Sequence, residues 1–360
     1  MTPSPDGLPD YRDRVRGCLL GGALGDALGA PVEFESIGQI RRQYGPEGLT
    51  DLAPDWRGTV GLITDDTQMT LFTVEGLLRG GDVAAVHHAY LRWLDTQQHA
   101  SPLIANGGFR TGRLREQKWL YSRRAPGNAC LSGLRRRQAP APAPPGLPGP
   151  VNPDSKGCGT VMRSAPFGLR APDPRHAFDL AAACAQLTHG HPTGALAAGA
   201  LAALVHFLVE GDPLTKAVRR SADLLATYPS HEETARAVEA AVSLAAEGAP
   251  SPEKVESLGG AWVAEEALAI AVYCALTHPE PDGFRAALLL AVNHSGDSDS
   301  TGAVCGNLLG ALHGEAALPR EWLRHLEGRE AIRELADDFA TQPVEDHEVT
   351  GAWLEKYPRD

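Results

Sequence analysis

The sequence has few cysteines, and they lack the spacings that build a cysteine-based metal site or a disulfide scaffold. Six cysteines are spread over 360 residues, and no C-x-x-C pair occurs among them. Several fall inside helical apolar patterns, which is typical of thiols in a reducing cytoplasm. We therefore expect a cytoplasmic protein without structural zinc and without disulfides.

Two further features are missing, a membrane-spanning segment and an excess of positive charge. The longest uncharged run, residues 180–209, is diluted by glycine and alanine and contains three histidines, so we interpret it as buried helix. Residues 1–13 contain no apolar stretch, so no signal peptide is expected. The net charge of −12 argues against nucleic acid or anionic lipid as a partner, but not against a small anionic substrate in one pocket.

Strand patterns are also absent, because alternating runs of Val, Ile, Thr and aromatic residues do not occur. Apolar residues instead recur three and four positions apart, with alanine and leucine dominant. Short connections marked by glycine and proline separate these stretches. We predict an all-α fold, a single compact multi-helix globule, with helices over residues 11–29, 66–78, 84–96, 174–187, 193–209, 213–228, 232–246, 263–276, 281–292 and 301–313.

Two stretches interrupt the helical pattern. Residues 37–63 are predicted to be irregular, and residues 138–153 contain seven prolines. We interpret the second stretch as an extended or partly disordered surface loop rather than a domain linker, because the helical composition is the same on both sides. The predicted organisation is a flexible N-terminus at 1–12, one domain at 13–342 that includes this loop, and a C-terminal extension at 343–360.

Two acidic clusters each stand directly before a predicted helix, Thr64-Asp65-Asp66-Thr67 and Gly296-Asp297-Ser298-Asp299-Ser300-Thr301. Helix capping explains one such side chain, because N-terminal amides lack partners and the helix dipole favours acids there. Five consecutive oxygen-bearing residues exceed what a cap needs, and Asp-x-Asp followed by a hydroxyl suits Mg²⁺, Mn²⁺ or Ca²⁺. If the clusters meet in space, one or two divalent cations would offset the repulsion of four carboxylates.

Glycine recurs every fourth residue in two predicted helices, at Gly21, Gly25 and Gly29 and at Gly302, Gly306 and Gly310. Because glycine destabilises a helix interior by about 1 kcal/mol, such ridges indicate backbones that pack very close together. Asp26 and Glu33 stand in and just after the first of these helices, on a nearly apolar background. Each needs either water or a cation, so both are candidate functional residues.

A Gly157-x-Gly159 turn between Ser155 and Thr160 opens a predicted helix, and its free amides would form a phosphate cradle. The segment is neither a Walker loop nor a complete dinucleotide fingerprint. Nearby, His189 and His191 have the chemistry of metal ligands, but two lone histidines at a helix junction are more often hydrogen-bonded caps.

Taken together and in this order, the motifs resemble the ADP-ribosylglycohydrolase family, which includes dinitrogenase reductase-activating glycohydrolases and ADP-ribosylarginine and ADP-ribosylserine hydrolases. Each motif alone is weak, whereas the ordered set spans residues 14–314. The matching segments are 16–29 with Glu33, 64–67, 157–159 running into 162–166, 188–189 and 296–300.

The resemblance implies an all-α globule with a central dinuclear site for two divalent cations, Mg²⁺ first and Mn²⁺ or Ca²⁺ as alternatives. Glu33 or Asp66 would act as general base. The metal ligands would be Thr64, Asp65, Asp66, Asp297, Asp299 and Ser300, with Thr301 as the alternative hydroxyl. The substrate would contact Asp26, Ser155, Gly157, Cys158, Gly159, Thr160 and His189.

The resemblance also implies hydrolysis of the glycosidic bond between C1″ of ADP-ribose and an acceptor on a protein or small molecule, with ADP-ribose as product and no membrane involved. The acceptor stays open among arginine, serine, poly(ADP-ribose) and nucleic acid ends, with arginine preferred on family frequency. Two other interpretations compete, a catalytically silent ADP-ribose-binding module and a two-metal phosphoesterase. The phosphoesterase usually adds histidine ligands and a mixed sheet, which the pattern does not show.

Overall fold

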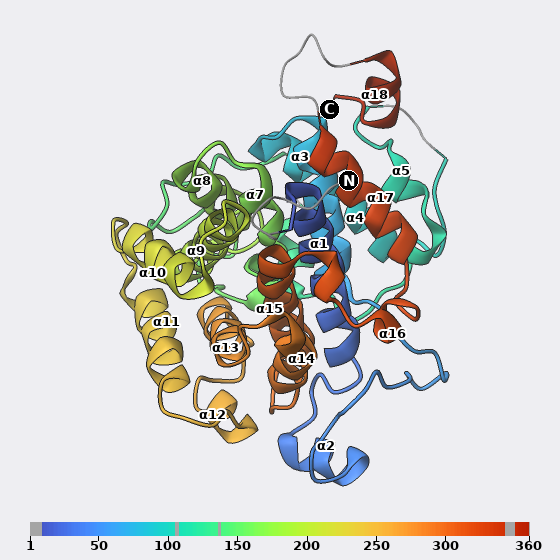
Figure 1. Cartoon of the computed structure of the whole chain (residues 1–360). Coiled ribbons are helices and arrows are strands. Elements are labelled where there is room, and N and C mark those ends of the chain that lie inside the picture. The colour runs from blue at the N-terminus through green and yellow to red at the C-terminus, as the bar shows by residue number, and fades with distance from the viewer. Residues whose placement is uncertain (1–8, 105–107, 136–137, 343–349, 360) are drawn as a thin grey trace.

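Helices α1 (Tyr11–Gly29) and α15 (Ser298–His313) pack against each other at the centre of the computed structural model, although they come from opposite ends of the chain (Figure 1). The structure describes residues 9–104, 108–135, 138–342 and 350–359. The other long helices are α3 (Asp65–Arg79), α4 (Val83–Gln98), α8 (Pro174–Ala185), α9 (Pro192–Val209), α10 (Leu214–Leu225), α11 (Glu232–Ala245), α13 (Ala264–Thr277), α14 (Phe284–Val292) and α17 (Arg329–Thr341).

Shorter helices connect and cover these elements. They are α2 (Ile37–Tyr44), α5 (Arg113–Glu116), α6 (Asn128–Gly133), α7 (Ala165–Arg170), α12 (Pro252–Glu256), α16 (Arg320–Leu323) and α18 (Gly351–Lys356), with 3₁₀ turns η1 (Lys118–Leu120), η2 (Cys158–Thr160), η3 (Pro281–Gly283) and η4 (Glu315–Ala317). Within the described ranges no strand occurs, only isolated bridges between Pro54 and Val60 and between Gly157 and Val263. The predicted all-α fold is confirmed.

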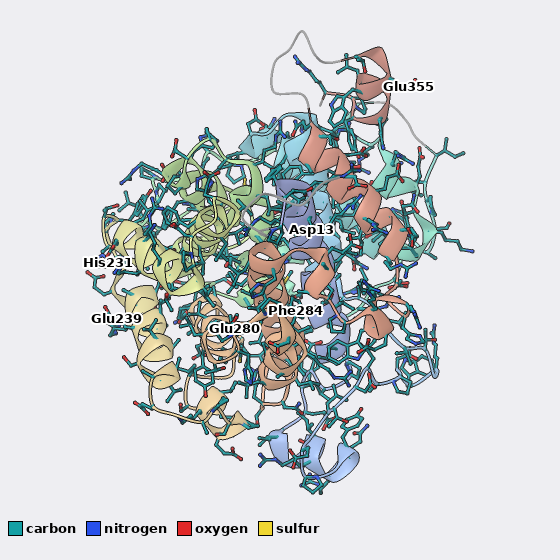
Figure 2. All side chains as sticks on the ribbon, in the orientation of Figure 1. Asp13, His231, Glu239, Glu280, Phe284 and Glu355 are labelled. Carbon is teal, nitrogen blue, oxygen red and sulfur yellow. The ribbon has the colours of Figure 1, made fainter. Side chains whose placement is uncertain are left out.

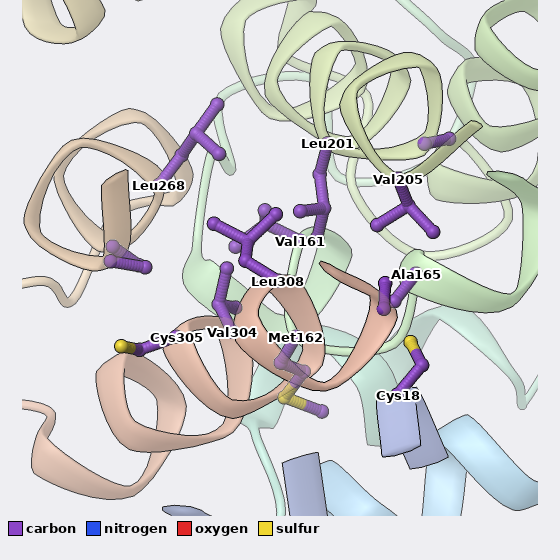
Figure 3. Packing of buried hydrophobic residues seen from close by; sticks show 14 of the residues in the cluster. Cys18, Val161, Met162, Ala165, Leu201, Val205, Leu268, Val304, Cys305 and Leu308 are labelled. Atoms are coloured by element: carbon purple, nitrogen blue, oxygen red, sulfur yellow. The ribbon is translucent and has the colours of Figure 1, made fainter. Parts of the chain in front are cut away.

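Helix α9 is a core helix. By length and composition it could cross a membrane, but 89% of its apolar window is buried inside the fold, as expected for this run. Figure 3 shows Leu201 and Val205 of α9 and Leu268 of α13 gathered around Val304 and Leu308 of α15. Charged side chains also lie at the periphery, as Glu239 of α11 and Glu355 of α18 show in Figure 2.

The two glycine ridges face each other in antiparallel order. A Cβ on Gly21 would lie 2.5 Å from the carbonyl oxygen of Gly306, and one on Gly25 would overlap the carbonyl of Gly302. Gly17, opposite Gly310, extends the same contact by another turn. The predicted close approach is confirmed, and it places the end of α1 beside the start of α15.

The segment 37–63 is not wholly irregular, contrary to the prediction. Its first residues form α2, which begins with a capping box between Ser36 and Gln39. Helices α3 and α15 also begin earlier than predicted, at Asp65 and Ser298. Asp299 and Ser300 therefore belong to the first turn of α15 and not to the loop before it.

The proline-rich loop 138–153 is extended as predicted, but it is ordered. The Gln186 side chain exchanges hydrogen bonds of 2.8 and 2.9 Å with the backbone of Ala143, and the Gly149 amide donates to the Gly190 carbonyl at 2.7 Å. These contacts hold the loop against the end of α8, which the composition alone did not predict.

The predicted terminal segments are only partly described. Residues 1–8 and 343–349 lie outside the described residues, and α1 already begins at Tyr11. In the C-terminal segment, the Tyr357 hydroxyl donates to Asp338 of α17 at 2.6 Å, and Lys356 pairs with Glu334 at 2.9 Å. The predicted domain boundaries stay a prediction.

Gly25→Ala is expected to destabilise the fold by about 3 kcal/mol or more, because the new Cβ would meet rigid helix backbone rather than a side chain. Urea unfolding followed by circular dichroism measures the change. Gly38→Ala in α2 is the control, since its Cβ would meet nothing closer than 3.5 Å, and it should leave stability unchanged or raise it by up to about 1 kcal/mol. Equal stability of the two variants would contradict the close packing of α1 on α15.

Candidate functional site

The contact between α1 and α15 brings acidic residues from both helices to one place. A Cβ on Gly29, the last residue of α1, would lie 2.5 Å from the Asp299 nitrogen. Glu33 follows within one turn, and its amide donates to the Gly29 carbonyl at 3.0 Å. Carboxylate oxygens of Glu33, Asp297 and Asp299 consequently lie within 4.8 Å of one another.

The N-terminus of α3 supplies the second acidic segment, and Asp26 holds it in place. The buried Asp26 carboxylate accepts hydrogen bonds from the Thr64 amide at 3.0 Å, from the Thr67 amide at 3.1 Å and from the Thr67 hydroxyl. Thr64 caps the helix by accepting from the Asp66 amide at 3.3 Å. Asp65 and Asp66 therefore stand buried in the first turn of α3.

A cavity of about 710 Å³ joins these segments. The acidic clusters that the sequence placed before two separate helices both line it. The predicted metal ligands on its wall are Asp65, Asp66, Asp297, Asp299 and Ser300, together with Glu33. Thr64 borders a second cavity instead.

The four aspartates are buried and Glu33 is half-buried, and all five carboxylates lack positive partners among the described residues. None of them forms an ion pair with lysine or arginine in the part of the chain that the structure describes. Burial, followed by the charges of Asp299 and Asp297, raises the pKa of Glu33 to about 10. Burial and the charge of Asp299 also raise the pKa of Asp65, Asp66 and Asp297 well above the ordinary range. The cluster cannot hold all its negative charges near neutral pH without a counter-charge.

The donor set fits a hard divalent cation. Oδ1 of Asp66 is buried and has no hydrogen-bond partner among the described residues, which is unfavourable unless a ligand binds it. Ser300 borders the cavity, whereas the Thr301 hydroxyl points away and donates to the Ala291 carbonyl at 2.7 Å. Carboxylate and hydroxyl oxygens are donors that Mg²⁺, Mn²⁺ and Ca²⁺ prefer. Of the two candidate hydroxyl residues, Ser300 is therefore the one that borders the cavity.

Five of the predicted substrate residues form another part of the cavity wall, Ser155, Gly157, Cys158, Gly159 and His189. The Cys158 thiol donates to a carboxylate oxygen of Asp297 at 2.6 Å. This bond ties the glycine turn to the acidic cluster.

Asp26 and Thr160 do not border this cavity, contrary to the prediction. The Asp26 carboxylate is occupied by the α3 N-terminus, and Thr160 is fully buried with its hydroxyl directed to the Gly157 carbonyl at 3.3 Å. One amide of the turn is not free for a ligand, because the Cys158 amide donates to the Trp262 carbonyl at 3.2 Å.

Comparison with known proteins shows which family shares this sequence and helical fold. A family model described as ADP-ribosylglycohydrolase matches residues 8–348. The chain belongs to the ADP-ribosylglycohydrolase family. The expected family is confirmed, and with it a hydrolase of glycosidic bonds.

Relatives of this ADP-ribosylglycohydrolase cover nearly its whole length. An ADP-ribosyl-[dinitrogen reductase] glycohydrolase of Rhodospirillum rubrum is 31% identical over 89% of this chain and 92% of its own. The ADP-ribosylarginine hydrolase Tri1 of Pseudomonas putida is 26% identical over 91% and 78%, and the human ADP-ribosylhydrolase ARH3 is 26% identical over 91% and 92%. A solved structure titled ADP-ribosylglycohydrolase-related protein complex superposes with a TM-score of 0.67 at 28% identity, covering 92% of this chain and 99% of that one.

The ADP-ribosylglycohydrolase cavity also contains an aromatic pair that the sequence did not predict. Phe34 and Trp262 stack with ring centroids 5.2 Å apart and an interplanar angle of 24°, and both border the cavity. Phe34 has a φ of 70°, in the left-handed region that a bulky residue rarely adopts. The only sequence signal is its place directly after Glu33, which does not reveal this backbone conformation.

A second cavity of about 630 Å³ adjoins the first. The two share Glu33, Arg123 and Ala125 in their linings. The lining of the second includes the exposed Trp56 and Arg57, whose guanidinium lies 4.3 Å from the centroid of the Trp56 ring. Glu33 therefore stands at the boundary between the two cavities.

Asp299→Asn is expected to stabilise the protein when divalent cations are removed with EDTA. The charge of Asp299 contributes to the raised pKa of each neighbouring carboxyl, and asparagine keeps the oxygen that accepts from the Ser300 amide. The free energy of unfolding at pH 7, measured with urea, should rise by about 1–2 kcal/mol. Because raised pKa values mean stability that is lost as pH rises, this gain should shrink as the pH falls toward 3.8, the ordinary aspartate value.

The control for this variant is Asp223→Asn, which changes an exposed acid on α10 and should leave stability within about 0.5 kcal/mol of wild type. A loss of stability in Asp299→Asn at pH 7, or no difference from the control, would show that the cluster carries no net repulsion.

Proposed function

We propose that this chain hydrolyses the bond between C1″ of ADP-ribose and a modified arginine of a protein or small molecule. The observation that supports this is the meeting of Asp65 and Asp66 with Asp297 and Asp299 in one cavity of a member of the ADP-ribosylglycohydrolase family. Arginine as acceptor is supported by the relative from Pseudomonas putida, which is named an ADP-ribosylarginine hydrolase.

Two divalent cations fit the site in this proposal, Mg²⁺ first and Mn²⁺ or Ca²⁺ as alternatives. The fit is supported by the unpartnered Asp66 Oδ1 and by the lack of cationic partners for the cluster within the described residues. Bound there, the ions would orient the ribose hydroxyls and lower the pKa of a bound water. The ligands would be Thr64, Asp65, Asp66, Asp297, Asp299 and Ser300.

Glu33 is the general base in this proposal, with Asp66 as the alternative. Burial and the neighbouring acidic charges raise the pKa of Glu33, and cations bound beside it would offset them, so that the carboxyl is ionised and can accept a proton. Glu33 lies at the boundary of the two cavities, between the space for ADP-ribose and the space for the acceptor. The hydroxyl of the attacking water bonds to C1″ as the bond from C1″ to nitrogen breaks. The proton of that water passes through Glu33 to the departing guanidine nitrogen, so charge and atoms balance.

The rest of ADP-ribose lies along the other wall in this proposal. Ser155, Gly157, Cys158, Gly159 and His189 would contact the ribose and pyrophosphate there. The exposed edges of Phe34 and Trp262 offer a surface on which a base can stack.

A cytoplasmic location and an ADP-ribosylated protein partner complete the proposal. All six cysteines are free, and five of them are buried, which suits a reducing compartment. The net charge of −12 disfavours a nucleic acid acceptor.

The proposed reaction is tested with a panel of ADP-ribosylated arginine, ADP-ribosylated serine and poly(ADP-ribose) under Mg²⁺, Mn²⁺, Ca²⁺ or EDTA. Arginine substrates should release free ADP-ribose with Mg²⁺ or Mn²⁺ and not with EDTA. Asp297→Asn removes a proposed ligand, so its activity should fall by more than the roughly 100-fold loss typical when a residue that only orients a metal ligand is changed. Asp223→Asn should keep wild-type rates. Release of AMP or phosphate would instead indicate a phosphoesterase, and binding without turnover a silent module.

Glu33→Gln separates the base from the metal ligands. If Glu33 takes the proton, kcat on ADP-ribosylarginine should fall by about 10²–10⁴-fold. Stabilisation of the protein by Mn²⁺ in thermal unfolding should persist, because Glu33 is not among the proposed ligands. An unchanged kcat in Glu33→Gln would move the role to Asp66.

A further inference from the structure

Arg163 is a buried cation without an acidic partner. It is 1% exposed, and none of the described residues forms an ion pair with it. Its guanidinium lies 4.4 Å from the centroid of the Tyr90 ring and 3.4 and 3.5 Å from the sulfur atoms of Met69 and Cys130. Burying a charge among such weak partners is unfavourable, so a role beyond packing is expected.

The strongest hydrogen bond of Arg163 goes to a side chain that continues toward the cavity. Nη2 of Arg163 donates to the Thr188 hydroxyl oxygen at 2.6 Å, and that oxygen lies 2.7 Å from Nδ1 of His189. The Thr188 hydroxyl can donate its proton either to this Nδ1, at 2.7 Å, or to the Ala185 carbonyl, at the longer distance of 3.3 Å.

The charge of Arg163 selects between the two proton arrangements. If Nδ1 of His189 carried the ring proton, this N–H would point at the Thr188 hydroxyl oxygen, which already accepts a hydrogen bond from the Arg163 guanidinium. If Nδ1 carries a lone pair instead, it accepts the Thr188 hydroxyl proton, and the positive charge of Arg163 favours this second arrangement. The ring proton then sits on Nε2.

The backbone around this chain of contacts is held rigidly. The Thr188 carbonyl accepts from the Asn152 side chain at 2.8 Å, and the His189 amide donates to the Ala185 carbonyl at 3.0 Å. A Cβ on Gly133 would lie 2.7 Å from the Thr188 Cα, so the neighbouring helix α6 packs directly against this turn.

Nε2 of His189 is free to meet a ligand. It lies at the glycine turn, where a Cβ on Gly157 would come within 3.2 Å of it, and no described residue hydrogen-bonds it. The ring is 2% exposed and borders the 710 Å³ cavity. Burial, followed by the charge of Arg163, lowers the pKa of His189 to about 3, so the ring is neutral and has one N–H to donate.

We propose that Arg163 is a positioning residue that acts through Thr188 to hold His189 in the Nε2–H tautomer, so that the ring donates to a phosphate or hydroxyl oxygen of the substrate. The identity of that substrate rests on the proposed function, whereas the tautomer itself does not. The chain of contacts gives the cavity a neutral donor beside its anionic wall.

The test is the ¹⁵N spectrum of histidine-labelled protein, with the His189 signals assigned by their loss in His189→Gln. Wild type should show Nδ1 unprotonated and Nε2 protonated. Thr188→Val, which removes the hydroxyl with little change of volume, should give a mixed tautomer signal and weaken ADP-ribose binding with Mg²⁺, measured by calorimetry, about tenfold. Thr188→Ser should restore both, and Arg163→Met should resemble Thr188→Val.

The control is Thr234→Val in α11, since Thr234 is fully buried with a hydroxyl that has no partner within the described residues. It should leave the His189 spectrum and ADP-ribose affinity unchanged. A protonated Nδ1 in wild type, or a Thr188→Val protein with the wild-type spectrum, would overturn the inference. If wild type failed to bind ADP-ribose, the proposed function would fail while the spectrum still tested the tautomer.

Discussion

The close contact of α1 with α15 is the constraint on which the site depends. Backbone meets backbone because glycines on each helix leave no Cβ between them, from Gly17 against Gly310 to Gly29 against Ser298. At such a separation the last turn of α1 and the first turn of α15 leave no room for a side chain between them. Carboxylates just beyond these turns must then share a small volume, whatever their mutual repulsion.

The residues that hold this charge also terminate helices. Thr64 and Asp297 are the N-caps of α3 and α15, and Asp26 satisfies two amides of the α3 N-terminus. Of these side chains, Asp297 both caps a helix and lines the cavity. Asp66, in the first turn of α3, is different, because its buried Oδ1 has no hydrogen-bond partner within the described residues.

Local patterns in the sequence were sufficient for most of the helices and for the glycine ridges, because each depends on spacing along the chain. The meeting of the two acidic clusters, which are far apart in the chain, was implied by the family resemblance and not by local spacing. The role of Asp26 was not predictable, since a buried carboxylate on α1 faces either the cavity or α3 according to the rotation of the helix. The stack of Phe34 on Trp262 joins distant segments through a left-handed residue. Which of Ser300 and Thr301 borders the cavity likewise depends on the residue at which α15 begins.

The placement of α15 near the C-terminal end has a consequence for how the molecule is made. Helix α1 is synthesised before α15, so the surface that its glycines need is complete only after α15 has been made. Until then α1 lacks its main packing partner, and closing so long a loop is entropically slow. Packing at the centre of the fold is therefore expected to form late, after most of the chain has been synthesised.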